Sequence, residues 1–284
     1  MKDTYQIGSF CFAIEMPAGL KIPVNFALFA KKCDPSFTYH LSLADELPCP
    51  FGTCIVQRDD LQVYVHDGLE ERYMGIAMSG QVYGCYREMD LSNADIVVMR
   101  AKADELVYDT VFTSLLALER HMEKDGLLLH CAYLCDDDGR AILFSAPSET
   151  GKSTQAGLWE KYRSGSRQIN GDKAYLQKTG DVWMARGWPV CGSSGICHNE
   201  DIPVRAIVML SQDTYNHCER MSPAAAFQAV FPQITINRWN KPALNASMDL
   251  LEQLISQVPF FHLGCTISEE AVDCLEETME AYDA

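Results

Sequence analysis

The residues of this chain that could do chemistry are concentrated in one segment, Ser145-Ala-Pro-Ser-Glu-Thr-Gly-Lys-Ser-Thr154. A known phosphate-binding pattern is Gly-x-x-x-x-Gly-Lys-Ser/Thr; here Gly151, Lys152 and Ser153 are in register, and Ala146 replaces the first glycine. In such a loop, backbone N–H groups surround the phosphates, the lysine reaches the outer phosphates, and the hydroxyl can ligate Mg²⁺. The segment therefore predicts a site for ATP or GTP together with Mg²⁺, and ATP is the expected cofactor. The residues expected to hold the nucleotide are Ser148, Glu149, Thr150, Gly151, Lys152, Ser153 and Thr154.

The segment also allows a structural interpretation. Glu149 places a carboxylate in a loop meant for phosphate, so its side chain has to point to solvent if anions bind there. A Gly-Lys-Ser turn can also do no more than begin a helix, in which case the loop is empty. The apolar run 141–144 before the segment and the helical pattern 155–162 after it favour the nucleotide site, because a phosphate loop joins a strand to a helix.

Two further residues could complete a phosphoryl-transfer site. Asp172 follows Gly171, and its carboxylate could bind Mg²⁺ or accept the proton of an attacking hydroxyl; a plain turn aspartate is the alternative. His130 precedes the strand of the loop and could contact the γ-phosphate; a buried core histidine is the alternative. We expect Asp172, His130 and Lys152 as catalytic residues, with Ser153 and Asp172 as metal ligands.

The pattern after residue 126 predicts an α/β domain around these residues. Apolar runs of strand length alternate with turn residues, and segments with helical spacing fill the last quarter of the chain. The predicted strands are 127–134, 140–145, 174–177, 182–185 and 204–210, and the predicted helices are 155–162, 223–231, 241–257 and 268–282. We expect residues 127–284 to form the nucleotide-binding domain.

The first hundred residues have the pattern of a β-rich domain. Short apolar or alternating runs separated by Pro, Gly, Asp and Asn predict its strands. These strands are 9–14, 25–29, 62–65, 73–78 and 95–99. Residues 103–121 have helical spacing, with Leu106, Phe112 and Leu115 on a broad apolar face. We therefore expect a β-rich domain over 1–103 and a connecting helix over 104–126.

The composition argues against two classes of partner. The 284 residues carry a formal net charge of −16, and no basic face of the kind that binds nucleic acid is visible. The chain has no run of 18 apolar residues, and its N-terminus lacks the pattern of a signal peptide. We expect a cytoplasmic protein that binds neither nucleic acid nor a membrane.

The twelve cysteines are scattered along the chain. No Cys-x-x-Cys pair is present, and the spacings of a zinc site are absent. We expect free thiols that act as small hydrophobic core residues in a reducing environment.

Several motifs of the second half occur in the order seen in a known family. Residues 127–271 resemble the C-terminal domain of HPr kinase/phosphorylase and, more distantly, ATP-dependent phosphoenolpyruvate carboxykinase; they are most similar to an uncharacterised bacterial branch of this group. The segments that carry the resemblance are Leu129-His130, the loop 145–154, Ile169-Asn-Gly-Asp-Lys-Ala174, Gly187-Trp-Pro-x-x-Gly192 and Pro259-Phe-Phe-His-Leu-Gly-Cys265. The first hundred residues are not covered.

The resemblance implies a phosphate loop in a twisted mixed sheet and transfer of the ATP γ-phosphoryl group to a hydroxyl of a peptide or protein serine or of a small molecule. It implies that Lys152 binds phosphate, that Ser153 ligates Mg²⁺, and that Asp172 is the second aspartate of a pair. The first aspartate, the usual general base, falls on Gly171, and a loop glycine falls on Glu149.

Loss of a general base costs about 10²–10⁴ in rate. A binding module in which ATP or ADP is a regulatory or structural ligand is therefore the second hypothesis, beside the kinase. The sequence leaves open the phosphoryl acceptor, the oligomeric state and the role of residues 1–103. It also leaves open whether ATP is preferred over GTP or pyrophosphate.

Overall fold

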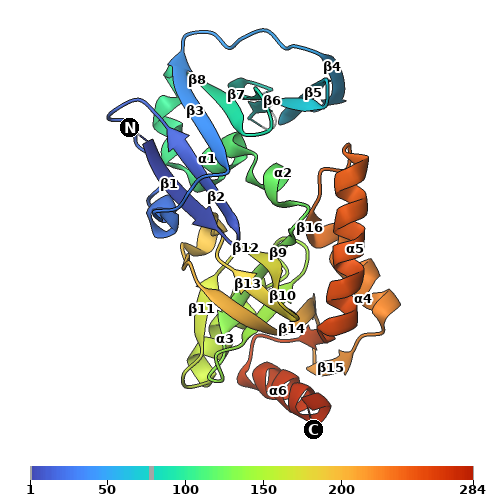
Figure 1. The fold of residues 1–284 in the computed structure, drawn as a ribbon. Coiled ribbons are helices and arrows are strands. Elements are labelled where there is room, and N and C mark those ends of the chain that lie inside the picture. Colours follow the sequence, from blue (N-terminus) through green and yellow to red (C-terminus); the bar gives the residue numbers. More distant parts are fainter. Residues whose placement is uncertain (1, 77–79, 284) are drawn as a thin grey trace. The chain divides into compact units, whose positions relative to one another are not determined.

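The computed structural model describes residues 2–76 and 80–283, and the chain divides into two units, Met1–His121 and Met122–Ala284. Figure 1 draws both units, with the first in blue to green and the second in green to red. The division falls inside the segment 104–126 to which the sequence pattern assigns a connecting helix. The protein has a mixed α/β fold, with one mixed sheet in each unit.

The first unit is built on an eight-stranded sheet with the order β1-β2-β3-β8-β7-β6-β5-β4. The pairs β2–β3 and β3–β8 are parallel, whereas the other neighbours are antiparallel. The strands are β1 (Lys2–Ile7), β2 (Phe10–Glu15), β3 (Phe37–Ala44), β4 (Thr53–Gln57), β5 (Leu61–His66), β6 (Leu69–Gly75), β7 (Val82–Glu88) and β8 (Asn93–Met99).

Aromatic side chains form much of the core of this unit. Phe26 of η1 (Val24–Phe29) meets Phe112 of α1 (Asp109–Leu116) edge to face, with ring centroids 4.8 Å apart. Both rings are fully buried. Such contacts between aromatic rings add to the free energy gained by burying them.

Two predictions of strands in this unit need correction or restriction. Residues 25–29 form the 3₁₀ helix η1 instead of a strand. Phe26 and Phe29 are buried and three residues apart, while Val24 and Leu28 are exposed, and a repeat of three is that of a 3₁₀ turn. The predicted strand 73–78 overlaps the end of β6, but residues 77–79 lie outside the described part of the chain.

The single connecting helix expected over 104–126 is divided among three short helices. They are η2 (Arg100–Val107), α1 (Asp109–Leu116) and α2 (Leu118–Met122). Tyr108 is extended, and Ala117 is left-handed with φ 45°. Residues 115–118 are all completely buried. Four successive residues cannot share one face of a straight helix with 3.6 residues per turn, so the chain turns at Ala117 instead.

The second unit contains a nine-stranded mixed sheet. The strand order is β10-β9-β12-β13-β14-β17-β15, while β11 and β16 pair with β9, and β10 also pairs with β14. The pairs β10–β14 and β14–β17 are parallel. The strands are β9 (Gly126–Cys135), β10 (Ala141–Ser145), β11 (Arg167–Asn170), β12 (Lys173–Thr179), β13 (Val182–Arg186), β14 (Asp201–Gln212), β15 (His217–Arg220), β16 (Ile234–Thr235) and β17 (Phe260–Cys265).

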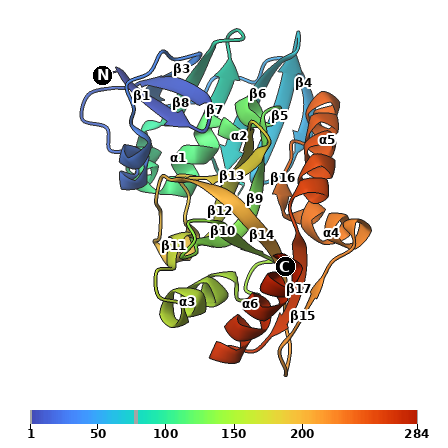
Figure 2. The same cartoon turned by 60° about the horizontal axis from the view of Figure 1, so that its bottom comes forward.

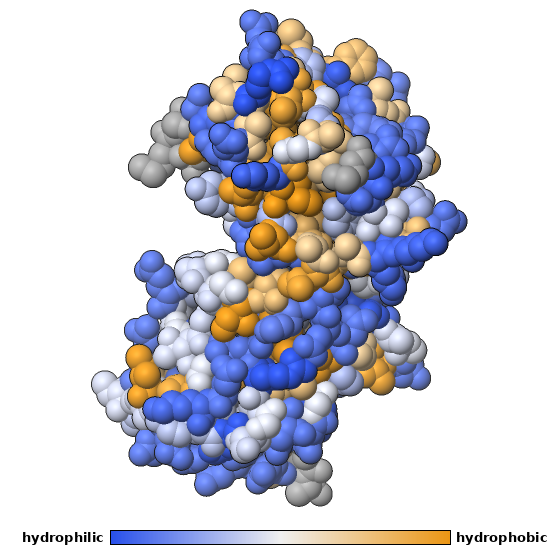
Figure 3. Space-filling model, turned by 90° about the vertical axis from the view of Figure 1, so that its left-hand side faces the viewer, coloured by the Kyte–Doolittle hydropathy of each residue, from blue (hydrophilic) through white to orange (hydrophobic). Residues whose placement is uncertain are grey.

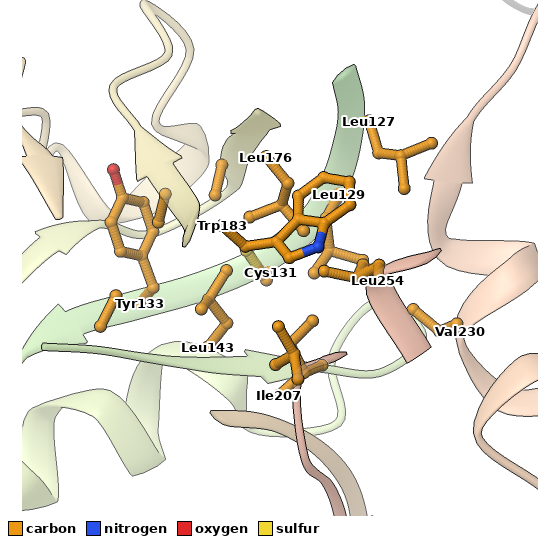
Figure 4. Close-up of a cluster of buried hydrophobic side chains, with 14 of the residues drawn as sticks. Leu127, Leu129, Cys131, Tyr133, Leu143, Leu176, Trp183, Ile207, Val230 and Leu254 are labelled. Carbon is orange, nitrogen blue, oxygen red and sulfur yellow. The ribbon is translucent and has the colours of Figure 1, made fainter. Parts of the chain in front are cut away.

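Helices pack on both faces of this sheet, as Figure 2 also shows. The helices are α3 (Lys152–Tyr162), η3 (Gly192–Ser194), α4 (Pro223–Val230), η4 (Phe231–Gln233), α5 (Lys241–Gln257) and α6 (Glu269–Asp283). One core joins the sheet to α4 and α5, and Figure 4 shows the Trp183 indole in the middle of its side chains. The other core joins the opposite face to α3 and α6 through Trp159 and Leu275. The two cores fix the positions of the strand ends.

The prediction that all cysteines are free thiols is wrong for two of them. Cys11 and Cys33 form a disulfide in the first unit. They are 22 residues apart, and only the fold brings them together, so no spacing in the sequence marks the pair. The ten other cysteines are in no disulfide, and Cys85, Cys131, Cys135, Cys191 and Cys265 among them are buried.

The surface is largely hydrophilic on the face that Figure 3 shows, with hydrophobic atoms between the polar ones. Some large hydrophobic side chains are nevertheless strongly exposed, such as Val24 and Leu91 in the first unit and Tyr215 and Ile267 in the second. Of the helices that the structure describes, none has the length and apolarity that a membrane span would need.

Candidate phosphate-binding site

The segment 146–151 connects the end of β10 to the start of α3. β10 is buried along its whole length and pairs with β9 on one side and β14 on the other. Gly151 caps α3 with φ 108°, and the first helical hydrogen bond runs from Gln155 N–H to Gly151 O at 2.9 Å. The N–H groups of the three preceding residues, 152–154, therefore have no acceptor within the helix, and a helix N-terminus of this kind favours anions.

The Lys152 side chain curls back beneath the loop. It is buried, and its Nζ donates to Ala146 O at 3.1 Å and to Pro147 O at 3.2 Å. Burial lowers the pKa of the Lys152 ammonium, and the nearby Cys131 and Asp172 act in the opposite direction. An ammonium has three donors, so one of them is left for a further acceptor such as a phosphate oxygen.

Glu149 occupies a backbone position that favours glycine. Its φ is 65°, in the left-handed region, and its side chain is exposed to solvent. Thr150 Oγ1 donates to Pro147 O at 2.9 Å and closes the turn beside it. Glu149 thus meets the condition of solvent exposure that anion binding at this loop requires.

His130, Asp172 and Lys173 meet beside the loop. Pairing of β9 with β12 places Lys173 directly opposite His130. His130 Nε2 lies 3.8 Å from Asp172 Oδ1, and Lys173 Nζ lies 3.8 Å from Asp172 Oδ2. Ser153 Oγ donates to Gly171 O at 3.2 Å, so the start of α3 is tied to the residue before Asp172. Ser153 keeps oxygen lone pairs for a cation, because a hydroxyl that donates can still accept.

The surroundings of His130 favour the neutral form of its imidazole. Burial lowers its pKa, and the positive charge of Lys152 lowers it further. His130 Nδ1 lies 3.3 Å from Gln233 Oε1, an acceptor, so this contact favours the tautomer with the proton on Nδ1. Nε2 lies on the side of Asp172.

Asn170 positions the Asp172 backbone. It is 1% exposed, and its Oδ1 accepts hydrogen bonds from Asp172 N at 2.8 Å and Lys173 N at 3.0 Å. Its Nδ2 donates to Trp188 O at 2.9 Å and Val190 O at 3.1 Å. One buried amide therefore joins the turn at 171–173 to the loop at 187–191, and all four of its hydrogen bonds are satisfied.

The structure brings together Lys152, Ser153, Asp172 and His130, which sequence reasoning singles out. It also adds Asn170 and Gln233, which that reasoning missed. Asn170-Gly171 is a turn dipeptide, and its asparagine could have signalled a side chain that bonds to its own turn. Gln233 carries no such signal, because it is 103 residues from His130.

Two oxygen-bearing side chains beside the loop, the Ser153 hydroxyl and the Asp172 carboxylate, are of the kind that could take part in holding a metal ion. Among the described residues, no group of three or more His, Cys, Asp or Glu is placed to hold a metal ion. Mg²⁺ in nucleotide sites is usually held by one or two protein oxygens together with phosphate oxygens and water. One hydroxyl, Ser153, and one carboxylate, Asp172, agree with that arrangement.

The chain shows similarity to solved structures but not to family models or curated proteins. No protein-family model matches the chain, and no curated protein matches it. Among solved structures, the chain is similar to the Hpr(Ser) kinase/phosphatase from Coxiella burnetii, with 11% identity and a TM-score of 0.33. That match covers 55% of this chain and 99% of the other.

Proposed function

We propose that the second unit is a Mg-ATP-dependent phosphotransferase that acts on a hydroxyl of a peptide or protein serine or of a small molecule. The observation that carries the proposal is the convergence of one buried cation, Lys152, and one carboxylate, Asp172, at the start of α3, where N–H groups without an acceptor inside the helix favour an anion. Phosphoryl transfer requires positioning and charge stabilisation of this kind.

Each residue has a defined part in this proposal. The N–H groups of 152–154 and the Lys152 ammonium hold the phosphates, and Ser153 Oγ and the Asp172 carboxylate hold Mg²⁺. Bound Mg-ATP supplies the phosphoryl group and an ion that neutralises charge on the phosphates. Asp172 accepts the proton of the acceptor hydroxyl. Neutral His130 adds no charge of its own, and its Nε2 faces Asp172.

A second candidate is a module that binds ATP or ADP without turnover. One observation favours this candidate. Ser194 fills the space that a side chain at position 171 would need, and position 171 is where the general base falls in the HPr kinase/phosphorylase family that the chain resembles. In this alternative the loop still binds phosphate, and Asp172 serves only the metal.

Thermal denaturation with and without Mg-ATP tests whether the loop binds nucleotide. We expect saturating Mg-ATP to raise the unfolding midpoint of the full chain by about 2–5 °C, because a ligand that binds only the folded state stabilises it. Lys152→Ala should lose this shift, whereas Lys161→Ala, at an exposed position of the same helix, should keep it. A shift retained in Lys152→Ala, or no shift in the wild type, would contradict the proposal.

ATP turnover separates the kinase from the binding module. In the kinase, Asp172→Asn should lower kcat about 100-fold or more while Mg-ATP still binds. Asp181→Asn changes an exposed turn aspartate and is the matched control. Binding without any turnover in the wild type would support the module instead.

A further inference from the structure

Beside the phosphate loop, the turn between β14 and β15 is tied to that loop by a side chain. Gln212, the last residue of β14, donates through Nε2 to Glu149 O at 3.4 Å and to Thr150 O at 3.5 Å. Tyr215 follows three residues later, so its Cα lies within about 10 Å of the Gln212 Cα, given the reach of an extended chain. The turn therefore stays next to the loop.

The other end of this turn is also fixed. Asn216 Oδ1 accepts a hydrogen bond from Thr266 N at 2.8 Å and a second from Thr266 Oγ1 at 3.2 Å. Near its start, Asp213 N donates to Cys265 O at 3.1 Å. The turn is thus anchored on both sides of Tyr215.

Tyr215 presents a rigid aromatic face. Its ring stacks on His217, with centroids 4.8 Å apart and planes 30° apart. His217 in turn packs against His262 with centroids 5.7 Å apart, and His262 Nε2 lies 3.0 Å from Ser211 Oγ. The His217 ring lies so close to Gly264 that a Cβ there would overlap it, so it cannot shift toward β17.

This ring is nevertheless open to solvent on its other side. Tyr215 is 62% exposed although one face of its ring stacks on His217, which itself packs against His262. An exposed, preorganised aromatic face beside a phosphate site is suited to stack a nucleobase, which every base can do through its π face.

We propose that Tyr215 stacks the base of the nucleotide whose phosphates bind at the loop 146–154. The inference rests on the proposed function, and it states that the ligand is a nucleoside polyphosphate and not an inorganic polyphosphate. The ribose bridges the distance between the phosphate loop and Tyr215, while His217 keeps the ring in place.

Isothermal titration calorimetry of the full chain with Mg-ATP and with Mg-tripolyphosphate tests the proposal. We expect the wild type to bind Mg-ATP about 10-fold more tightly than Mg-tripolyphosphate. Tyr215→Ala should weaken Mg-ATP about 10-fold, which is the size of the loss of one base–aromatic stack, and leave Mg-tripolyphosphate within twofold. Tyr215→Phe should retain wild-type affinity. Tyr108→Ala removes an equally exposed ring, 61%, from the first unit and should change neither affinity.

The outcomes separate this inference from the proposed function. If Tyr215→Ala binds Mg-ATP as the wild type does, or if the wild type binds both ligands equally, the base site is overturned. Loss of both affinities in Lys152→Ala would then still support the phosphate site. If neither ligand binds the wild type, both proposals fail.

Discussion

The side chain of Ser194 occupies the space that a side chain at position 171 would need. A Cβ built on Gly171 would overlap Ser194 Oγ and Cβ. Ser194 Oγ donates to Cys191 O at 2.7 Å and accepts from Ile196 N at 3.1 Å, so it is held in place. The glycine at 171 and the serine at 194 therefore form a matched pair, and a larger side chain at 171 would require Ser194 to move.

We predict that Gly171→Asp lowers the free energy of unfolding by about 1–3 kcal/mol, as overpacking does. In the double variant Gly171→Asp/Ser194→Gly, the loss should be smaller than the sum of the two single losses, because the added side chain gains room. Urea denaturation of the four proteins of this cycle measures the coupling. Additive losses would show that the two positions do not compete for space.

The strained backbone at Glu149 gives a second prediction. A left-handed φ costs a residue with a side chain about 1–2 kcal/mol, and glycine avoids that cost but is more flexible when unfolded. Glu149→Gly should therefore raise the free energy of unfolding by about 0.5–1 kcal/mol and also tighten Mg-ATP binding, because a carboxylate leaves the loop.

Asp67→Gly is the matched control for this variant. Asp67 has φ 50° and belongs to the first unit, so it should show a similar change in stability with no change in Mg-ATP affinity. Urea denaturation and calorimetry measure the two effects. An unchanged affinity in Glu149→Gly would mean that the carboxylate does not act on the ligand.

His121 makes the first unit sensitive to acid. Its ring stacks on Phe10 and packs on Phe37, and its Nε2 lies 2.9 Å from Tyr86 Oη. Burial lowers the pKa of His121 to about 3, with Arg120 and Arg72 adding to the effect. The reference value is 6.5, so between pH 6.5 and 3 the unfolded chain binds a proton that the folded chain does not.

Stability should therefore fall as the pH drops through this window, with a contribution from His121 of about 1.4 kcal/mol per pH unit. His121→Phe keeps an aromatic ring without a titratable nitrogen, so its unfolding free energy should depend less steeply on pH. Urea denaturation at several pH values compares the two proteins. Equal slopes would rule out His121 as the source.

Thiol titration tests the disulfide of the first unit. The chain has twelve cysteines, of which Cys11 and Cys33 are paired, so the denatured, unreduced protein should react at ten thiols and the reduced protein at twelve. Cys33→Ser should give eleven reactive thiols without reduction. Twelve thiols in the unreduced wild type would favour the original expectation that all are free.

Much of the second unit follows from local sequence. The predicted helix 241–257 agrees with α5, and its start carries local signals: the Asn240 side chain accepts from Ala243 N, and Pro242 lies in the first turn. The strand before the loop and the helix after it are also where the pattern predicts them. The predictions from local pattern were wrong where burial outweighed that pattern, as in the helix break at Ala117 and the 3₁₀ helix η1.

The sequence by itself determined the order of strand, loop and helix around Lys152, because this order depends on residues that are neighbours along the chain. Only the tertiary structure decided that His130 faces Asp172 and that Ser194 fills the space beside Gly171. Strand pairing and loop packing set these contacts between residues far apart in the chain. Such contacts depend on how whole elements fill the core, which no short pattern of residues encodes.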